Sequence, residues 1–465
     1  MDDITARLRD ALRALCSERV KGTEDMLSAE TSALEDTLEQ LRLAFGEALE
    51  AFDDGLLEAK PGGWRCRCRR PRTLVTEFGE VTYARRSYID DLGSRRCPLD
   101  ELLAIPADKS LSPAAARMVV RYAADVPYRA AAALLCEHAH STLSAPTVMS
   151  CLRDVGRLLG EADEQARHSM YDDGVLPKAP EEAPGLCMET DGCWVHLQGG
   201  HAHGCEVKAL VAYAGKEPDG HGALRRSGPV VHFAEVAAPV RFDQEALARV
   251  AGTYDMSSVE RAHLGFDGAD WCSGLAEWVP APVEGHLDRW HLARAMRDAL
   301  PQSSRRSRAW RAIASGDLDG LCSWLEGIGG PNAAKCRALA AYVRGNASAI
   351  LSDGPSLGTM EGTNAHLYAS RMKHFGGGWS RRGASDMARI RSAIASGDEL
   401  PAVTRDASFP PAERRSRERR RKLALERMRY YVEDTEGHGY EPPSASVEGL
   451  RSDVVFSADL DGMAF

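Results

Sequence analysis

The chain has 465 residues, of which 44% are hydrophobic and 27% charged, and its formal net charge is −10 at pH 7. This length and composition are typical of a soluble protein with about two to four domains. We expect a cytoplasmic protein, because no run of about eighteen apolar residues could cross a membrane and the N-terminus has no apolar signal segment. The negative charge argues against a surface that is basic throughout, although arginines and lysines gather in particular stretches.

Residues 1–62 are predicted to be helical. Leucine and phenylalanine recur at three- and four-residue steps from Leu27 to Leu56, as on one face of a helix, and Pro61 then ends the pattern. This apolar face either packs on its own domain or pairs with a second copy of the chain.

Residues 63–110 are predicted to form a small β module, with a hairpin turn at Phe78-Gly79-Glu80. Cys66, Cys68 and Cys97 could hold zinc, but their spacing is not that of a zinc ribbon or finger, and the sequence leaves this open. The module begins with clustered arginines that either contact DNA phosphates or form a solvated face. The candidates for DNA contact are Arg65, Arg67, Arg69 and Arg70.

Residues 111–171 contain three helical patterns, which begin at Pro113, Tyr128 and Ser144. Ser144 is suited to cap the third helix, and a proline follows in its first turn. Two short helices joined by a tight turn resemble a helix-turn-helix, so Ser144 and Thr147 are candidate DNA contacts. Helical hairpins of this size occur in many folds, and the pattern alone does not establish DNA binding. A polar, proline-containing linker follows at about 172–184.

Residues 184–396 carry strand and helix patterns in the order β-β-β-α-β-α-β. The first strand contains Asp191, and the fourth and fifth end at Asp267 and Asp288. This order is that of an RNase H-like sheet, in which acids at the carboxyl ends of parallel strands lie close together. A helical insertion is predicted at about 292–355, and Glu361 then begins another helix.

Three of these acids suit metal-dependent cleavage of a phosphodiester. Two Mg²⁺ ions about 3.5–4 Å apart activate a water and stabilise the leaving oxygen, and they require carboxylate ligands. We predict that Asp191, Asp267 and Glu361 are the catalytic and metal-binding residues, with two Mg²⁺ ions, or Mn²⁺, as cofactors. Asp270 is a competing candidate, although a residue inside a helix points away from a strand end.

The C-terminal tail, residues 397–465, contains a basic run at 413–422. Arg414 and Arg415 in this run could attract the DNA backbone, or the run could be a solvated helix or a disordered arm.

Four segments together resemble a known family. These segments are Glu189-Thr-Asp-Gly-Cys-Trp-Val195, Gly265-Phe-Asp-Gly-Ala-Asp-Trp271, Leu287-Asp-Arg-Trp-His291 and the block from Glu361-Gly-Thr-Asn-Ala-His366 through Ser370-Arg-Met-Lys to Gly383. They are similar to the bacterial ISLre-type insertion-sequence transposases, which are related in pattern to Mutator-like transposases. The similarity extends over residues 64–395.

The resemblance implies a DDE catalytic domain in which Asp191, Asp267 and Glu361 match the three acids. It also implies that Asp288 and His291 match the element after the second aspartate, where the histidine helps to arrange DNA or the metal site. A purely structural role for His291, bonded to Asp288 at a helix start, remains an alternative. Asn364 and Arg371 are predicted to support the site, and Lys373 to contact DNA.

We therefore expect the transposase of an insertion sequence. It would bind the terminal inverted repeats of a mobile element in double-stranded DNA, cleave strands with Mg²⁺ and transfer the freed 3′ end to target DNA, acting as a homo-oligomer. Two alternatives stay open: a catalytically inactive transposase-derived DNA-binding protein, and an RNase H-like nuclease without strand transfer.

Overall fold

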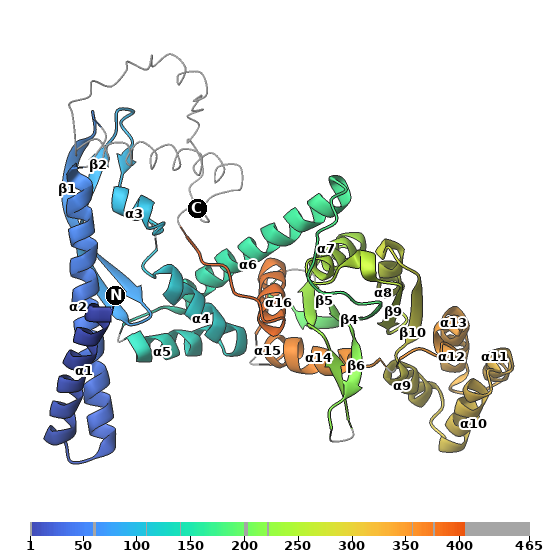
Figure 1. Cartoon of the computed structure of the whole chain (residues 1–465). Helices are drawn as coiled ribbons and strands as arrows, with labels where there is room; N and C mark the ends of the chain where they lie inside the picture. Colours follow the sequence, from blue (N-terminus) through green and yellow to red (C-terminus); the bar gives the residue numbers. More distant parts are fainter. Residues whose placement is uncertain are drawn as a thin grey trace.

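The computed structural model describes residues 2–404, apart from 59–61, 108, 140, 200–202, 221–222, 356 and 375–376 (Figure 1). The described part is a mixed α/β structure with a five-stranded sheet, a three-stranded sheet and a two-stranded ribbon. The basic segment with Arg414 and Arg415 lies outside the described residues. Within the described ranges, no helix has the length and apolar character needed to cross a membrane.

The N-terminal part is a helical hairpin beside a three-stranded sheet, drawn in blue in Figure 1. The helical pattern is interrupted near Asp25, whose carboxylate accepts the Ser28 N–H at 2.8 Å, so two helices form where the sequence suggested one. Leu49 and Leu56 of the second helix share a core with Leu74 of the sheet. The bounds are α1 Asp2–Gly22, α2 Met26–Glu58, β1 Arg65–Thr76, β2 Gly79–Ile89, β3 Arg95–Arg96 and α3 Pro98–Leu102.

Three helices follow, and the last of them reaches the central sheet. Their bounds are α4 Pro113–Asp125, α5 Tyr128–Ala139 and α6 Ala145–Arg167, and α6 continues as a π-helical turn over His168–Asp172. Ser112 and Ser144 cap α4 and α6 by accepting a main-chain N–H of the first turn. Helix α6 packs against α16 (Arg381–Ala395), which lies on the sheet (Figure 1). One hydrophobic core includes residues of α4, α6, α16 and the sheet, so the linker at about 172–184 joins parts that share a core.

The central sheet has the strand order β10-β9-β4-β5-β8. Strands β4, β5 and β8 are antiparallel, whereas β9 and β10 run parallel to β4. Alternate residues of β4 face two cores: Cys193 and Val195 contribute to the core with α16, and Leu186 and Met188 to the core with α7. The bounds are β4 Gly185–His196, β5 Gly204–Tyr213, β6 Gly215–Pro218, β7 Leu224–Ser227, β8 Val231–Glu235, α7 Pro239–Ala251, β9 Arg261–Phe266, α8 Asp270–Gly274 and β10 Val283–Leu287, with 3₁₀ turns at Met256–Ser258 and Leu275–Trp278.

A group of helices follows β10 at one end of the sheet, and the chain then returns to the sheet (Figure 1). The predicted run from 292 to 355 is divided into several short helices, because Pro301, Gly316 and Gly330 interrupt the helical pattern. The bounds are α9 Arg289–Ala299, α10 Ser303–Ala314, α11 Leu318–Glu326, α12 Ala333–Gly345, α13 Ala347–Ile350, α14 Met360–Thr363, a π-helical turn over Asn364–Ala369, and α15 Ser370–Met372.

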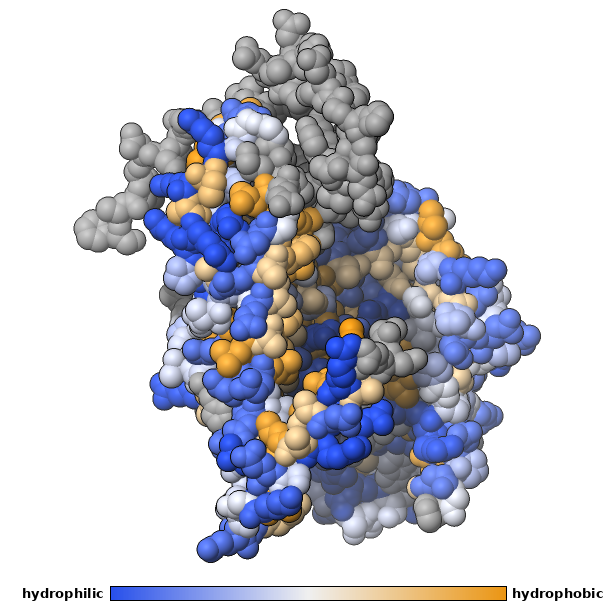
Figure 2. All heavy atoms as spheres, turned by 60° about the vertical axis from the view of Figure 1, so that its left-hand side comes forward, coloured by the Kyte–Doolittle hydropathy of each residue, from blue (hydrophilic) through white to orange (hydrophobic). Residues whose placement is uncertain are grey.

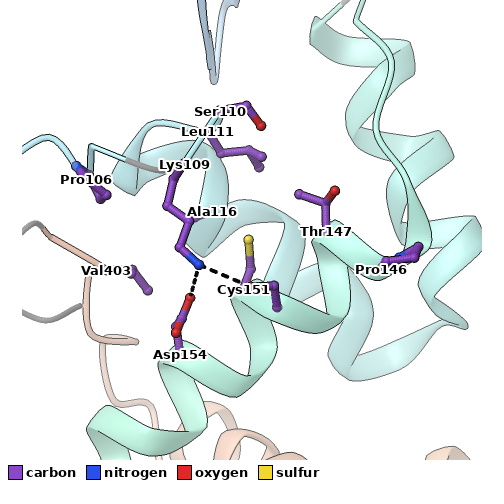
Figure 3. Close-up of a pocket in the computed structure, with 11 residues that line it drawn as sticks. Pro106, Lys109, Ser110, Leu111, Ala116, Pro146, Thr147, Cys151, Asp154 and Val403 are labelled. Atoms are coloured by element: carbon purple, nitrogen blue, oxygen red, sulfur yellow. Dashed lines mark hydrogen bonds and ion pairs between the residues drawn. The ribbon is translucent and has the colours of Figure 1, made fainter. Parts of the chain in front are cut away.

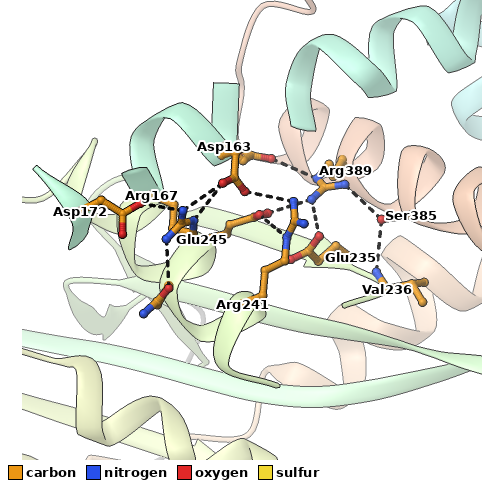
Figure 4. Close-up of polar contacts among 11 residues, drawn as sticks. Asp163, Arg167, Asp172, Glu235, Val236, Arg241, Glu245, Ser385 and Arg389 are labelled. Carbon is orange, nitrogen blue, oxygen red and sulfur yellow. Dashed lines mark hydrogen bonds and ion pairs between the residues drawn. The ribbon is translucent and has the colours of Figure 1, made fainter. Parts of the chain in front are cut away.

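A buried ion network joins α6, β8, α7 and α16 (Figure 4). The Arg389 guanidinium donates to Asp163 at 3.2 Å, to Glu245 at 2.8 Å and to Glu235. Burial raises the pKa of Glu235 to about 8 and that of Asp163 to about 6, although Arg389 opposes both shifts. One buried guanidinium therefore holds three carboxylates together across four elements.

Candidate active site

The predicted acids lie at one edge of the central sheet. Asp191 is in β4, Asp267 directly follows β9, and Asp288 directly follows β10 and caps α9 by accepting the Trp290 N–H. The Asp288 N–H donates to the Phe266 carbonyl at 2.8 Å, which keeps the ends of these two strands in register. Because β4, β9 and β10 are adjacent and parallel, their acids gather at the same edge.

Asp191, His291 and Glu361 form a group in which one candidate ligand atom of each lies within 4.8 Å of the others. These residues are 170 positions apart along the chain at the extremes, and they come from β4, α9 and α14. Asp191 is 8% exposed, and the other two are half-buried. Two carboxylates and an imidazole in this arrangement could bind a divalent cation.

Asp267 lies beside this group without being a member of it. Its negative charge contributes to raising the pKa of Asp191. One of its carboxylate oxygens accepts the Ala269 N–H at 2.8 Å, and its main-chain oxygen accepts the Tyr342 hydroxyl at 2.5 Å. Gly268 permits this approach: its φ is +96°, and a Cβ there would lie 2.5 Å from the Tyr342 ring. The competing candidate Asp270 is exposed on α8.

The Asp191 carboxylate is strongly influenced by its surroundings. Burial raises its pKa to about 6, while the Gly192 N–H, His291 and the Asn364 amide oppose this shift. Asn364 Nδ2 donates to Asp191 Oδ2 at 2.8 Å, and the Asn364 side-chain oxygen is buried with no partner among the described residues. The Asn364 amide nitrogen thus orients the predicted ligand Asp191, and the Asn364 side-chain oxygen stays unpaired among the described residues.

His291 contacts Asp288 and also belongs to the candidate metal-binding group of Asp191, His291 and Glu361. Its Nδ1 lies 3.3 Å from Asp288 Oδ2, which leaves Nε2 as the nitrogen available to Asp191 and Glu361. The hydrogen bond to Asp288 raises the pKa of His291, and Asp191 and Asp267 add to this. The structural bond to Asp288 and the metal-ligand role are therefore compatible, since a ligating histidine usually donates its other ring N–H to a carboxylate, a main-chain carbonyl or water.

Glu189 is the residue of this site that sequence reasoning missed. It is 2% exposed, two positions before Asp191 and on the same face of β4. Its Oε2 accepts three main-chain N–H groups, from Gly358 and Thr359 at 2.7 Å and from Met360 at 3.2 Å. Its Oε1 accepts the hydroxyls of Thr359 at 2.6 Å and Tyr213 at 2.7 Å. Glu189 thereby fixes the start of α14, the helix that carries Glu361; a charged residue within an apolar strand was the available signal.

Arg371 and Lys373 lie in different surroundings. Arg371 is buried, donates to the Ala123 carbonyl at 3.0 Å and stacks on Tyr128 and Trp379. Its contacts attach α15 to α4, so its support for the site is indirect. Lys373 is exposed.

The predicted DNA contacts of the N-terminal half are at the surface of β1 and α6. Arg65, Arg67, Arg69 and Arg70 are all exposed along β1, and Arg69 pairs with Glu50 of α2 at 2.9 Å. Among the described residues, Cys66, Cys68 and Cys97 do not form a group with the geometry of a metal site.

Ser144 is exposed at the start of α6, and Thr147 lines a pocket between α6 and α4 (Figure 3). The cation of this pocket, Lys109, pairs with Asp154 at 2.9 Å and donates to Ser150 at 3.1 Å. The lining is a mixture of apolar and short polar side chains: Pro106, Lys109, Ser110, Leu111, Ala116, Pro146, Thr147, Ser150, Cys151, Asp154 and Val403.

Comparison with known proteins places these residues in a family context. A family model described as "Uncharacterised protein family (UPF0236)" matches residues 25–407. UPF0236 protein TTE2489 of Caldanaerobacter subterraneus subsp. tengcongensis is 24% identical over 400 residues, which are 83% of this chain and 79% of that protein. A second UPF0236 protein of that organism, whose name joins eleven designations, is 23% identical over 83% of this chain and 78% of its own length.

Proposed function

We propose that this chain, which belongs to the UPF0236 family, is the metal-dependent DNA transposase of an insertion sequence. The observation that carries the proposal is the group formed by Asp191, His291 and Glu361, with Asp267 beside it, at the carboxyl edge of the central sheet. Three carboxylates brought together from separate segments are the ligands that metal-dependent phosphodiester chemistry needs.

The strand order supports the same proposal. Three antiparallel strands, followed by two that run parallel to the first and lie on its other side, form the arrangement β10-β9-β4-β5-β8. We infer an RNase H-like fold from this order, and the resemblance to ISLre-type transposases agrees with it. Since one fold supports several functions, the proposal depends on the site and not on the fold alone.

The names of two relatives give independent support. One protein name joins eleven designations within one organism, and another joins four. A gene that moves by copying or repeated insertion would produce nearly identical proteins at many positions in one genome. We therefore infer that the relatives of this chain are transposases that act on their own elements.

The residues at the site fit divalent cations. Asp191, Glu361 and His291 would hold one Mg²⁺ or Mn²⁺, and Asp267 beside Asp191 would help to hold a second. Burial and the neighbouring carboxylate of Asp267 raise the pKa of Asp191, and a bound cation would offset this rise. The buried side-chain oxygen of Asn364 has no partner among the described residues and could also face a cation. When bound, such ions activate water and stabilise the leaving 3′ oxygen. Asp288 orients His291, and Glu189 holds the helix of Glu361.

The exposed surfaces suit DNA contact and self-association. The arginines on β1 could neutralise phosphates, whose contacts position a protein without reading sequence. Helix α2 exposes apolar side chains in two series with seven-residue steps, which are separated by a step of four, and this spacing favours helix pairing. Figure 2, which brings this side forward, shows hydrophobic residues along it between hydrophilic ones. The exposed apolar residues of α2 include Leu27, Leu34, Leu41, Phe45 and Phe52.

The test is strand cleavage and joining on DNA that carries the ends of the element encoding this chain. With Mg²⁺, the wild type should cleave and join strands. Asp267→Asn should lose at least about 100-fold in rate, because it removes a carboxylate that would help to hold the second cation, which stabilises charge on the leaving oxygen. Asp270→Asn, three positions away and exposed, is the matched control and should retain full activity. DNA binding without cleavage by the wild type would favour the inactive DNA-binding protein, and cleavage without joining would favour the nuclease.

Asp288→Ala should lower the affinity of the site for Mn²⁺ by about 10–100-fold, since a carboxylate bonded to a ligating histidine orients it. Calorimetric titration with Mn²⁺ measures this. Asp317→Ala is the control, because Asp317 caps α11 in the same way but outside the site. Equal Mn²⁺ affinity in the wild type and the Asp288 variant would mean that Asp288 does not orient a ligand of the metal.

A further inference from the structure

A second group of potential metal ligands lies on β9 and β10. His263 and Glu284 are direct neighbours across these parallel strands, and His286 is two positions further along β10. The ligand atoms of the three residues lie within 4.8 Å of one another. His263 Nδ1 is 3.0 Å from His286 Nε2 and 3.6 Å from Glu284 Oε2, so the three side chains converge near one point.

A hydrogen bond at Nδ1 of His286 leaves its Nε2 as the nitrogen that can bind a metal. Its Nδ1 lies 2.6 Å from the Ser352 hydroxyl, which is also within 3.4 Å of the Ala349 carbonyl. If Ser352 donates to that carbonyl, it accepts the Nδ1–H of His286, and the lone pair of His286 is then on Nε2, facing His263. A hydrogen-bonded partner on the second nitrogen is the usual arrangement of a ligating histidine.

The backbone passes close over this histidine pair. A Cβ on Gly354 would lie 2.0 Å from His286 Cε1 and 3.1 Å from His263 Nδ1. Gly354 lies in the segment between α13 and α14, which leads to Glu361. At Gly354 this segment covers the two histidines. Glu284 remains about one-third exposed, which leaves access for an ion and a water ligand.

We propose that His263, Glu284 and His286 form a second metal site, which takes a transition-metal ion of the zinc class and fastens β9 and β10 beneath the segment leading to Glu361. Two imidazoles and one carboxylate are a common ligand set for zinc, with water in the fourth position. Mg²⁺ prefers oxygen ligands, and this site offers two imidazoles and one carboxylate, whereas the site around Asp191 offers two carboxylates and one imidazole, so the two sites differ in the metal they favour. The proposal does not depend on the transposase function, because metal binding can be measured without DNA.

Zinc titration of the full chain tests this proposal. Asp191→Asn and Glu361→Gln are combined as the background, so that the first group does not contribute. This background should bind one Zn²⁺ per chain, and Co²⁺ in its place should give the visible absorption of a tetrahedral site. Adding Glu284→Gln, which keeps the side-chain shape, or His286→Ala should weaken Zn²⁺ binding by more than about 100-fold. A loss of about 10–100-fold is what removing a residue that only contacts a metal ligand would cause.

His196→Ala on the exposed part of β4 is the matched control and should leave the affinity unchanged. Circular dichroism of each variant separates loss of the ligand from loss of the fold, and Glu284→Gln serves if His286→Ala does not fold. Absence of Zn²⁺ binding in the background protein, or equal affinity in the Glu284 variant, would overturn the proposal. The two histidines would then be a hydrogen-bonded pair only.

Discussion

Glu189→Ala should reduce strand cleavage by at least about 100-fold, whereas Glu189→Gln should retain most of the activity. The alanine variant leaves three main-chain N–H groups at the start of α14 without their acceptor, and one of them, that of Met360, belongs to a buried residue. A buried N–H without a partner costs about 1–3 kcal/mol, so we expect the free energy of unfolding to fall by at least about 1–3 kcal/mol. The position of Glu361 would be lost with these bonds, and small displacements of reacting groups have large effects on rate.

Glutamine can replace Glu189 because the two carboxylate oxygens have different partners. A glutamine oxygen in place of Oε2 would still accept the three N–H groups, and its amide in place of Oε1 could donate to the hydroxyls of Thr359 and Tyr213. A metal ligand could not be replaced in this way. Cleavage rates of both variants, compared with those of Asp191→Asn, distinguish the two roles. Equal loss in Glu189→Gln and Asp191→Asn would mean that Glu189 acts on the metal directly.

Arg389→Met should lower the free energy of unfolding by about 3–5 kcal/mol, the cost of removing one partner from a buried ion network. The guanidinium is 9% exposed and is the shared partner of Asp163, Glu235 and Glu245, as Figure 4 shows. Its loss leaves three buried carboxylates close together between α6, β8 and α7. Urea denaturation measures the change. Arg344→Met is the control: Arg344 and its partner Glu326 are both largely exposed, so this pair contributes about 0–1 kcal/mol.

The stability deficit of Arg389→Met should grow as the pH rises from about 5 to about 8. Burial raises the pKa of Glu235 to about 8 and that of Asp163 to about 6, so both acids favour the fold in their protonated forms. The stability that these two acids contribute is fully present below their ordinary pKa values, and it is lost as the pH rises through their raised pKa values in the folded protein. Without Arg389 the ionised carboxylates have lost their main counter-charge. A deficit that is constant over this range would show that packing, not charge, determines the effect.

Much of the local structure could be predicted from the sequence. Ser112 and Ser144 cap helices where serine followed by proline predicts a helix start. The alternation of apolar residues around Asp191, and the short apolar runs before Asp267 and Asp288, correspond to β4, β9 and β10. These features depend on residues within a few positions of one another, so the sequence carries them directly.

The sequence also indicated which acids should meet, but not how they are held. The predicted set is Asp191, Asp267 and Glu361. In the structure Asp191 and Glu361 form a group with His291, whereas Asp267 lies beside that group and has its own partners, Ala269 and Tyr342. The hydrogen bonds that Glu189 accepts from the main chain of residues 358–360 span 169 to 171 positions of the chain, and no local pattern predicts them.

By itself, the sequence determined most strands of the central sheet, their order and the edge of the sheet where the acids gather, because periodicity, caps and strand ends are local properties. Only the tertiary structure decided that Glu189 holds α14, that Arg389 joins three acids and that His263 meets His286. Each of these contacts requires two or more elements to dock at a particular height and rotation. That docking depends on the packing of whole cores, and the residues near any one position do not encode it.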